Sequence, residues 1–222
     1  FRHPAYAHNG KDRFKEQVTM TQYFDPNPTT PSDRKMIPYR MNGINFEFFT
    51  DTSVFSRKEV DFGTNLLIDT LVKDIKARGP KMERFVDLGC GVGIVGIVIK
   101  SCFMAFDVTG VDINSRAVAL ARENCVQNGV NCRFMSSDIL FGVRDEHFDI
   151  IATNPPVRAG KKTVFGFYEQ SFEVLNPGGY LYVVLQRKQG APSTMDKLNE
   201  LFDNCETLAI DGGYRVMRAR KE

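Results

Sequence analysis

Apolar and polar positions follow two alternating patterns along most of the chain. Short apolar runs at 84–88, 107–112 and 147–153 predict buried strands. Between them, apolar residues recur every three or four positions, which predicts helices over about 93–101 and 114–128. The same patterns predict further strands at 131–135, 180–185, 206–210 and 214–218, and further helices at about 61–79, 163–175 and 192–202.

Strands that alternate with helices at this spacing predict an α/β fold with a doubly wound, mainly parallel sheet. In such sheets ligands bind at the carboxyl ends of the strands, so residues that follow strands are the first candidates for a site. Turn signals agree with the boundaries, since Gly79-Pro80 follows one predicted helix and Asn176 to Gly179 another. Asp211-Gly212-Gly213 predicts a hairpin between the last two strands.

The first 60 residues follow a different pattern. Partial alternation around Asn42-Gly43 predicts a β-hairpin over 40–49, after a proline-rich loop or linker at 25–32. Residues 1–20 are polar, begin with Phe and contain His3 and His8, and Met20 is a candidate natural start. We therefore expect a disordered, tag-like leader over 1–20, an N-terminal extension over 21–60 and one main domain over 61–222.

Composition narrows the class of protein. The 222 residues are 42% hydrophobic and 25% charged, and no apolar run approaches the roughly 20 residues of a membrane span. The five cysteines form an odd set without C-x-x-C spacing, which argues against a disulfide framework and a zinc site and favours a reduced, cytoplasmic protein without metal. With a net charge of +2, affinity for nucleic acid would have to come from local clusters of basic residues.

A glycine-rich turn over Gly89 to Gly96 follows the predicted strand at 84–88. Gly91 to Gly96 satisfies G-x-G-x-x-G, and Asp112 follows Gly93 by 19 positions (112 − 93), so this stretch alone fits a dinucleotide as well as any other nucleotide cofactor. Asp87, at the end of the strand, separates the alternatives. A carboxylate there is unfavourable beside a pyrophosphate and favourable beside the sulfonium and ammonium groups of S-adenosylmethionine, which is the cofactor we expect.

The rest of the predicted cofactor site follows the next two strands. Asp112 would accept hydrogen bonds from the ribose hydroxyls, although it could instead cap the following helix. Asp138 would accept from the adenine amine, although a turn aspartate is the plainer alternative. The predicted cofactor-binding residues are Asp61, Thr64, Asp87, Gly89, Cys90, Gly91, Gly93, Asp112, Ile113, Asp138, Ile139 and Asn154.

Asn154-Pro155-Pro156 ends the strand at 147–153, at the same edge of the sheet, and indicates the reaction. The side-chain carbonyl of Asn154 and the main-chain carbonyl of Pro155 can both accept from a planar NH₂ group and hold its nitrogen in line with a methyl donor. The two acceptors stabilise the positive charge that develops as the amine attacks, so no general base is needed before transfer. We therefore predict that Asn154, Pro155 and Pro156 are the catalytic residues.

These motifs resemble the class I S-adenosylmethionine-dependent methyltransferases, specifically the amino-methylating branch with its N-P-P signature. The stretches TDTSVFSRKEVDFGT at 50–64, NPPVRAGK at 154–161 and VLQRKQGAPS at 184–193 are similar to the RsmC-like small methyltransferase family, and the resemblance covers about 21–222. It implies a Rossmann-like, seven-stranded sheet with one antiparallel strand, and methyl transfer to the N2 amine of a guanine in 16S ribosomal RNA. It also implies that Asp61, Gly63 and Thr64 border the cofactor, and that ribosomal RNA or the small ribosomal subunit is the partner.

Two positions depart from the resemblance. Many amino-methyltransferases have Tyr or Phe after the second proline, where an aromatic ring stacks on the substrate, and this chain has Val157. Phe55 is then the candidate for stacking, with a core position as the alternative. Ser53 stands where the family pattern has glycine, which changes the expected conformation of its loop.

Basic residues follow two of the site-forming strands. Arg158, Lys161 and Lys162 come after Asn154-Pro155-Pro156, and Arg187 and Lys188 follow the strand at 180–185. They could face phosphates beside the target base, although such loops are often only solvated. The predicted substrate-binding residues are Phe55, Val157, Arg158, Lys161, Arg187 and Lys188, with Arg215, Arg218 and Arg220 as weaker candidates.

Other functions stay open at this point. The same Asn-Pro-Pro geometry could serve protein glutamine-N5 or nucleic-acid adenine-N6 methylation, although Val157 and the basic loop count against the former. A nicotinamide oxidoreductase or a non-catalytic nucleotide-binding module is disfavoured by Asp87 together with Asn154. The oligomeric state has no signature in the sequence.

Overall fold

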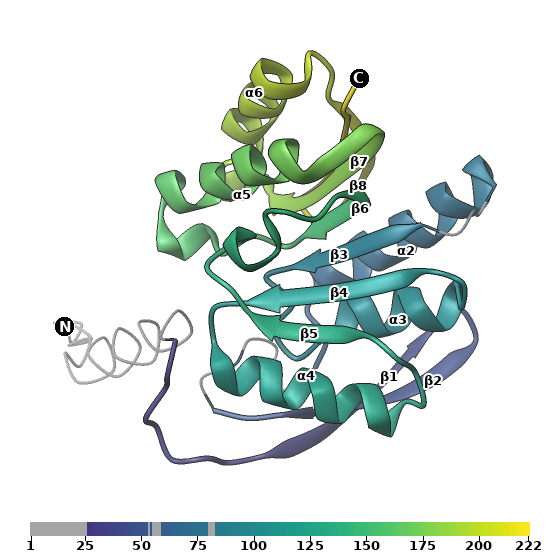
Figure 1. The fold of residues 1–222 in the computed structure, drawn as a ribbon, viewed down its shortest axis with the longest axis vertical. Helices are drawn as coiled ribbons and strands as arrows, with labels where there is room; N and C mark the ends of the chain where they lie inside the picture. The colour runs from purple at the N-terminus through teal and green to yellow at the C-terminus, as the bar shows by residue number, and fades with distance from the viewer. Residues whose placement is uncertain (1–25, 53, 55–58, 80–82) are drawn as a thin grey trace, which may run out of the picture.

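The computed structural model describes residues 26–52, 54, 59–79 and 83–222. The predictions for the leader, Ser53 and Phe55 lie outside these residues. Seven strands form one sheet in the order β5-β4-β3-β6-β7-β9-β8 (Figure 1). They are β3 (Arg84–Leu88), β4 (Asp107–Asp112), β5 (Arg133–Ser136), β6 (Phe148–Thr153), β7 (Leu175–Gln186), β8 (Glu206–Asp211) and β9 (Tyr214–Arg220).

The sheet confirms the predicted α/β class. All neighbouring strands from β5 to β7 pair in parallel, and β9 runs antiparallel to both β7 and β8. The chain proceeds from β3 outwards to β5 and then returns to β6 on the other side of β3. This reversal between β3 and β6 is the topological switch point, where the loops at the carboxyl ends of two strands diverge and leave room for a ligand.

Helices cover both faces of the sheet (Figure 1). They are α2 (Phe62–Arg78), α3 (Ile94–Cys102), α4 (Ser115–Gln127), α5 (Lys161–Val174) and α6 (Ala191–Phe202). Neighbouring strand residues alternate between the two resulting cores. Phe85 is buried with α2, α3 and α4, whereas Val86 is buried with α5 and α6. Apolar residues on both faces explain the nearly continuous apolar strands of the sequence.

The predicted N-terminal hairpin is present and longer than predicted. It pairs β1 (Lys35–Met41) with β2 (Ile44–Thr50), and Asn42 and Gly43 adopt positive φ angles of 50° and 81° in the two-residue turn. The buried side chain of Asn124 on α4 joins the hairpin to the glycine turn. Its Nδ2 donates to the carbonyls of Phe49 (3.0 Å) and Val92 (2.9 Å), so this extension is part of the same packed unit as the sheet.

Two boundaries differ from the predictions. Helix α5 begins at Lys161, two residues early, so Lys161 and Lys162 lie in its first turn and not in a loop. Strand β7 begins at Leu175, the last residue of the predicted helix, and runs through the predicted turn at 176–179 to Tyr180 with a register irregularity. The strand continues because the carbonyl of Lys221 accepts from Gly178 N (2.6 Å) and the carbonyl of Gly179 accepts from Lys221 N (2.9 Å), which pairs the irregular segment with the chain after β9.

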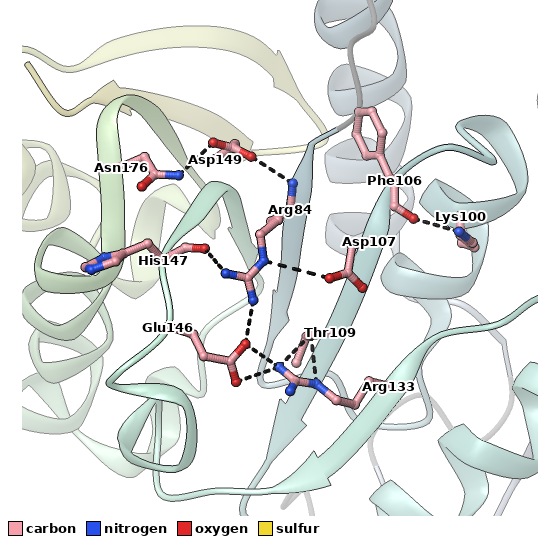
Figure 2. Close-up of polar contacts among 10 residues, drawn as sticks. All are labelled: Arg84, Lys100, Phe106, Asp107, Thr109, Arg133, Glu146, His147, Asp149 and Asn176. Carbon is pink, nitrogen blue, oxygen red and sulfur yellow. Dashed lines mark hydrogen bonds and ion pairs between the residues drawn. The ribbon is translucent and has the colours of Figure 1, made fainter.

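The amino edge of the sheet, where the parallel strands begin, is held by paired charges (Figure 2). Arg84 donates to the carbonyl of His147 (2.7 Å) and pairs with Glu146, which also accepts from Arg133 at 2.8 and 2.9 Å. Asp149 accepts from the main-chain N–H of Arg84 (2.8 Å). Each of these charged groups has a partner within the chain.

None of the helices in the described ranges combines the length and apolarity needed to cross a membrane.

Candidate active site

The glycine turn joins β3 to α3 at the carboxyl edge of the sheet. Gly89, Gly91 and Gly93 have positive φ angles of 72°, 52° and 86°, which side chains other than glycine rarely adopt. The main-chain N–H groups of Gly89 and Cys90 both donate to the carbonyl of Val111 (2.9 Å each), and this fixes the turn against β4. The turn is therefore rigid before any ligand binds.

Other side chains of the protein pack against only part of this turn. A Cβ at Gly93 would lie 2.9 Å from the Phe134 ring and 3.0 Å from Ala121, so glycine is needed there for packing. A Cβ at Gly91 would meet nothing within 4 Å. Gly91 therefore exposes its backbone to open space, which suits close contact with a ligand.

Asp87 lies in the last part of β3 and is only 3% exposed. Its Oδ2 accepts from the N–H of Gly96 on α3 (2.9 Å). Burial, together with repulsion from Asp112, raises the pKa of Asp87 to about 7. Within the described residues no Lys or Arg forms an ion pair with it, so its ionised form has no counter-ion there.

Asp112, at the end of β4, is fixed by backbone groups on both sides. Its Oδ2 accepts from Gly91 N (2.8 Å) and its Oδ1 from Asn114 N (2.9 Å), while burial raises its pKa. The capping alternative is wrong, because the side chain of Asn114 caps α4 by accepting from the N–H groups of Arg116 (3.0 Å) and Ala117 (3.1 Å). Each carboxylate oxygen of Asp112 keeps acceptor capacity for a hydroxyl group.

The third site-forming segment follows β5. Ser137 N donates to the carbonyl of Asp112 (2.9 Å), which places this segment beside the ribose-binding candidate. Ile139 has a φ of 51°, a strained value for a β-branched residue, and the Leu140 N–H bonds the Gln170 side chain (2.9 Å). Asp138 is exposed at this strained turn. Its contact with the adenine amine stays a prediction.

The side-chain amide of Asn154, which follows β6, is held by residues at the start of α2. Its Nδ2 donates to Thr64 Oγ1 (3.0 Å) and to Asp61 Oδ1 (3.3 Å). Asp61 is the N-cap of α2 and accepts from Thr64 N (3.1 Å) through the same oxygen. The start of α2 therefore occupies the donor side of the Asn154 amide and leaves its carbonyl oxygen as the acceptor.

The two prolines shape the loop that follows. Pro155 is buried, and its carbonyl accepts from Val157 N (2.9 Å) at the start of the short 3₁₀ helix Val157–Ala159. A carbonyl has two lone pairs, so this bond leaves Pro155 one acceptor position for a substrate. Pro156 and Val157 are partly exposed beside it.

The basic candidates divide into two groups, one that follows β6 and one that follows β7. Arg158 and Lys161 are exposed, and Lys161 Nζ lies 4.9 Å from the centre of the Phe165 ring. Arg187 and Lys188 are exposed in the 3₁₀ helix η4 (Arg187–Gln189) after β7. The structure thus brings Asp61, Thr64 and the residues that follow β3 to β7 to one edge of the sheet.

The sequence analysis missed the contact between Asn154 and α2. The partners are 90 and 93 residues apart, and no periodicity connects them. Asp61 and Thr64 were predicted beside the cofactor, and the structure places their side chains against the Asn154 amide. The spacing of Asp61 and Thr64 is typical of a helix N-cap, so the sequence indicates that a helix begins there. It does not indicate which residue the start of that helix contacts.

This geometry agrees with the comparison to known proteins. The profile of the methyltransferase small domain matches residues 45–218, which include every site-forming segment described above. The chain belongs to the methyltransferase small domain family. It is therefore a methyltransferase of the class that uses S-adenosylmethionine. The oxidoreductase alternative falls with this assignment.

The chain is 40% identical over 202 residues to the uncharacterized protein YbxB of Bacillus subtilis, covering 90% of this chain and 98% of that protein. It is 31% identical over 186 residues to ribosomal RNA small subunit methyltransferase C of Actinobacillus pleuropneumoniae, covering 82% of this chain and 54% of that one. A solved structure of T. thermophilus RsmC, a 16S rRNA N2 methyltransferase in complex with AdoMet and guanosine, superposes with a TM-score of 0.78 at 26% identity, covering 88% and 52%. The chain spans about half the length of these two named methyltransferases.

Proposed function

We propose that this protein transfers a methyl group from S-adenosylmethionine to the exocyclic N2 amine of a guanine in 16S ribosomal RNA. The observation that carries the proposal is the orientation of Asn154. Because Thr64 and Asp61 hold its Nδ2, its Oδ1 is left as a fixed acceptor that would bind a planar amine. The names of the small-subunit relatives support the choice of RNA.

The residues of the carboxyl edge fit S-adenosylmethionine. Asp87 supplies a buried carboxyl, without a cationic partner in the described residues, that would ionise against a cationic ligand, and Gly91 supplies an open backbone. Asp112 and Ile113 would hold the ribose, Asp138 and Ile139 the adenine, and Asp87 with the turn from Gly89 to Gly93 the methionine portion. When bound, the cofactor supplies an electrophilic methyl group on a sulfonium.

The protein's contribution to the reaction is to hold the amine and stabilise its charge. Asn154 Oδ1 and the carbonyl of Pro155 would accept the two N–H groups, which leaves the nitrogen lone pair free to attack. As the nitrogen becomes positive, these fixed acceptors bind it more strongly than the neutral amine. Its proton can then leave to water, so the site needs no base.

Substrate binding would rest on charge around this acceptor pair. Arg158 and Lys161 follow β6, and Arg187 and Lys188 follow β7. Exposed cations at these places can contact the phosphates next to a flipped base. Val157 offers an apolar contact and no ring, so a stacking partner has to come from another element.

The test is the identity of the methylated product. The protein is incubated with S-adenosylmethionine labelled in its methyl group and, separately, with unmethylated small subunits, large subunits, free 16S RNA and release factors. We expect label in small-subunit RNA that is recovered as N2-methylguanosine after digestion to nucleosides. Label recovered as N6-methyladenosine, in large-subunit RNA or in protein would contradict the proposal.

A further inference from the structure

An exposed aromatic ring lies next to the group that holds Asn154. Phe62 is the first residue of α2, directly after Asp61, and it is 46% exposed. Its ring centre lies 5.6 Å from that of Tyr214 at the start of β9, with an angle of 39° between the planes. A large apolar side chain this exposed at the edge of an active site is a candidate for contact with substrate.

Two glycines let the rings of Phe62 and Tyr214 approach the backbone. A Cβ at Gly212, in the β8–β9 turn, would lie 2.7 Å from the Phe62 ring, and a Cβ at Gly63 would lie 2.8 Å from the Tyr214 ring. Gly212 also has a positive φ of 53°. The β8–β9 turn therefore supports part of the Phe62 ring and fixes its position, while the rest of the ring stays open to solvent.

A basic segment is attached to the same turn through its main chain. The main-chain N–H of Arg187 donates to the carbonyl of Gly213 (2.8 Å), which is next to Gly212. Arg187 and Lys188 are exposed in the segment that this bond attaches to the turn, which also carries the exposed Asp211. We call Phe62, Tyr214, Arg187 and Lys188 the aromatic corner. It combines a supported, open ring with positive charge, which is the combination that binds single-stranded nucleic acid.

We propose that the aromatic corner stacks a nucleobase of the RNA strand that carries the acceptor amine. Phe62 provides the stacking ring, Tyr214 supports it, and Arg187 and Lys188 contact the neighbouring phosphates. The inference rests on the proposed function for its substrate and adds a specific base-binding position to it. It also supplies the aromatic contact that Val157 does not provide.

The absence of tryptophan from the sequence makes this contact directly measurable. A Phe62→Trp variant has one tryptophan, at the aromatic corner, and a Met104→Trp variant has one at an exposed position between α3 and β4, at the amino edge. Each is titrated with a single-stranded RNA oligonucleotide of mixed sequence and with polyphosphate, which has the charge without the bases. We expect RNA to quench the Phe62→Trp emission, polyphosphate to leave it unchanged, and the Met104→Trp emission to respond to neither.

Three fluorescence outcomes overturn the inference. They are equal quenching of Phe62→Trp by RNA and polyphosphate, quenching by neither, and an emission shift that depends on protein concentration without RNA. The first outcome means that charge alone causes the quenching, and the second means that no base binds at the aromatic corner. The third means that a second copy of the chain covers the aromatic corner.

Activity gives the second readout. Phe62→Ala should raise the KM for the RNA substrate by roughly 5- to 150-fold, the range that base–aromatic stacking supplies, whereas Phe62→Tyr should stay near the wild type. An unchanged KM in Phe62→Ala overturns the inference while the proposed function stands. A wild-type protein that methylates no RNA defeats the proposed function, and the fluorescence titration then decides separately whether the corner binds bases.

Discussion

The two edges of the central sheet differ in whether their charged side chains form ion pairs. At the amino edge, Arg84 and Arg133 pair with Glu146 (Figure 2). At the carboxyl edge, Asp87 and Asp112 are bonded by backbone N–H groups and form no ion pair within the described residues, and the pKa values of both are raised. Charges that pair with one another within the protein can stabilise a fold. Buried charges without a counter-ion cost stability and are typical of ligand sites.

The same contrast holds for two asparagines. Asn176 donates through Nδ2 to Asp149 (2.8 Å) within the amino-edge network. Asn154 also donates through Nδ2, to Thr64 and Asp61, and lies at the carboxyl edge. The amide of Asn176 serves the fold, and that of Asn154 is expected to serve the reaction.

The largest effect on the reaction should come from replacing Asn154 by alanine, with Asn176→Ala as the control. Asn154→Ala should lower kcat by about 100- to 1,000-fold, the loss typical of removing one preorganised acceptor or donor, because nothing else replaces its Oδ1. Affinity for S-adenosylmethionine should change only a few-fold. The matched Asn176→Ala should keep kcat within about two-fold, as measured by single-turnover methyl transfer. Equal losses in both variants would remove the functional distinction between the edges.

Asp87→Asn should change how the stability of the ligand-free protein depends on pH. A carboxyl whose pKa is near 7 in the folded state and 3.8 otherwise stabilises the fold when protonated, and this contribution is lost as pH rises from about 4 through 7. Relative to the wild type, the variant should therefore gain about 2–4 kcal/mol between pH 5 and pH 8, since one pKa unit is worth about 1.4 kcal/mol.

Denaturant unfolding across this pH range measures the gain. The control is Asp107→Asn, which removes an exposed amino-edge carboxylate paired with Arg84. Its unfolding free energy should differ from the wild type by about 0.5 kcal/mol or less at either pH. A pH-independent difference between wild type and Asp87→Asn would show that Asp87 is ionised in the free protein.

Thr64→Val should have a smaller effect on the reaction. The substitution keeps the shape but removes the hydroxyl that holds Asn154, so kcat should fall by about 10-fold while the Kd of S-adenosylmethionine stays unchanged. Thr64→Ser should restore most of the rate. Thr70→Val is the control within the same helix, since Thr70 lies six residues after Thr64 and its hydroxyl donates to the carbonyl of Leu66 (2.8 Å). A weaker Kd with normal kcat would instead assign Thr64 to the cofactor.

The smallest effect should come from the amino edge. Glu146→Ala removes the shared partner of Arg84 and Arg133, and because these side chains are partly exposed the unfolding free energy should fall by only about 1 kcal/mol. Methyl-transfer kinetics at 25 °C should be unchanged. A large fall in kcat would show that this network influences the catalytic edge.

The positions of the candidate residues at the carboxyl edge could be predicted from local features of the sequence. Asp87, Asp112 and Asn154 each follow an apolar run and precede a turn, so the strand ends place them without any knowledge of packing. The mainly parallel sheet follows from the alternation, and its seven strands with one antiparallel follow from the family resemblance. These features are local, and local features are what a sequence pattern records.

Contacts between distant segments could not be predicted in this way. The bond from Asn154 to Thr64 and the approach of Phe62 to Gly212 depend on how α2 packs beside β9, which no periodicity encodes. The start of β7 was missed for a related reason. Pro177 and Gly178 indicate a turn locally, yet hydrogen bonds to Lys221 keep the segment in the sheet. Tertiary pairing overrides local preference at such positions.

Proton release on cofactor binding tests most directly whether the catalytic edge holds an uncompensated carboxyl for a cationic ligand. Titration calorimetry at pH 6.5, in two buffers with different ionisation enthalpies, gives the number of protons released when S-adenosylmethionine binds. Because Asp87 is mostly protonated below its pKa of about 7, binding should release most of one proton at pH 6.5, and this release should disappear by about pH 8.5 and in Asp87→Asn. Binding of the wild type without proton release at pH 6.5 would contradict this picture of the site.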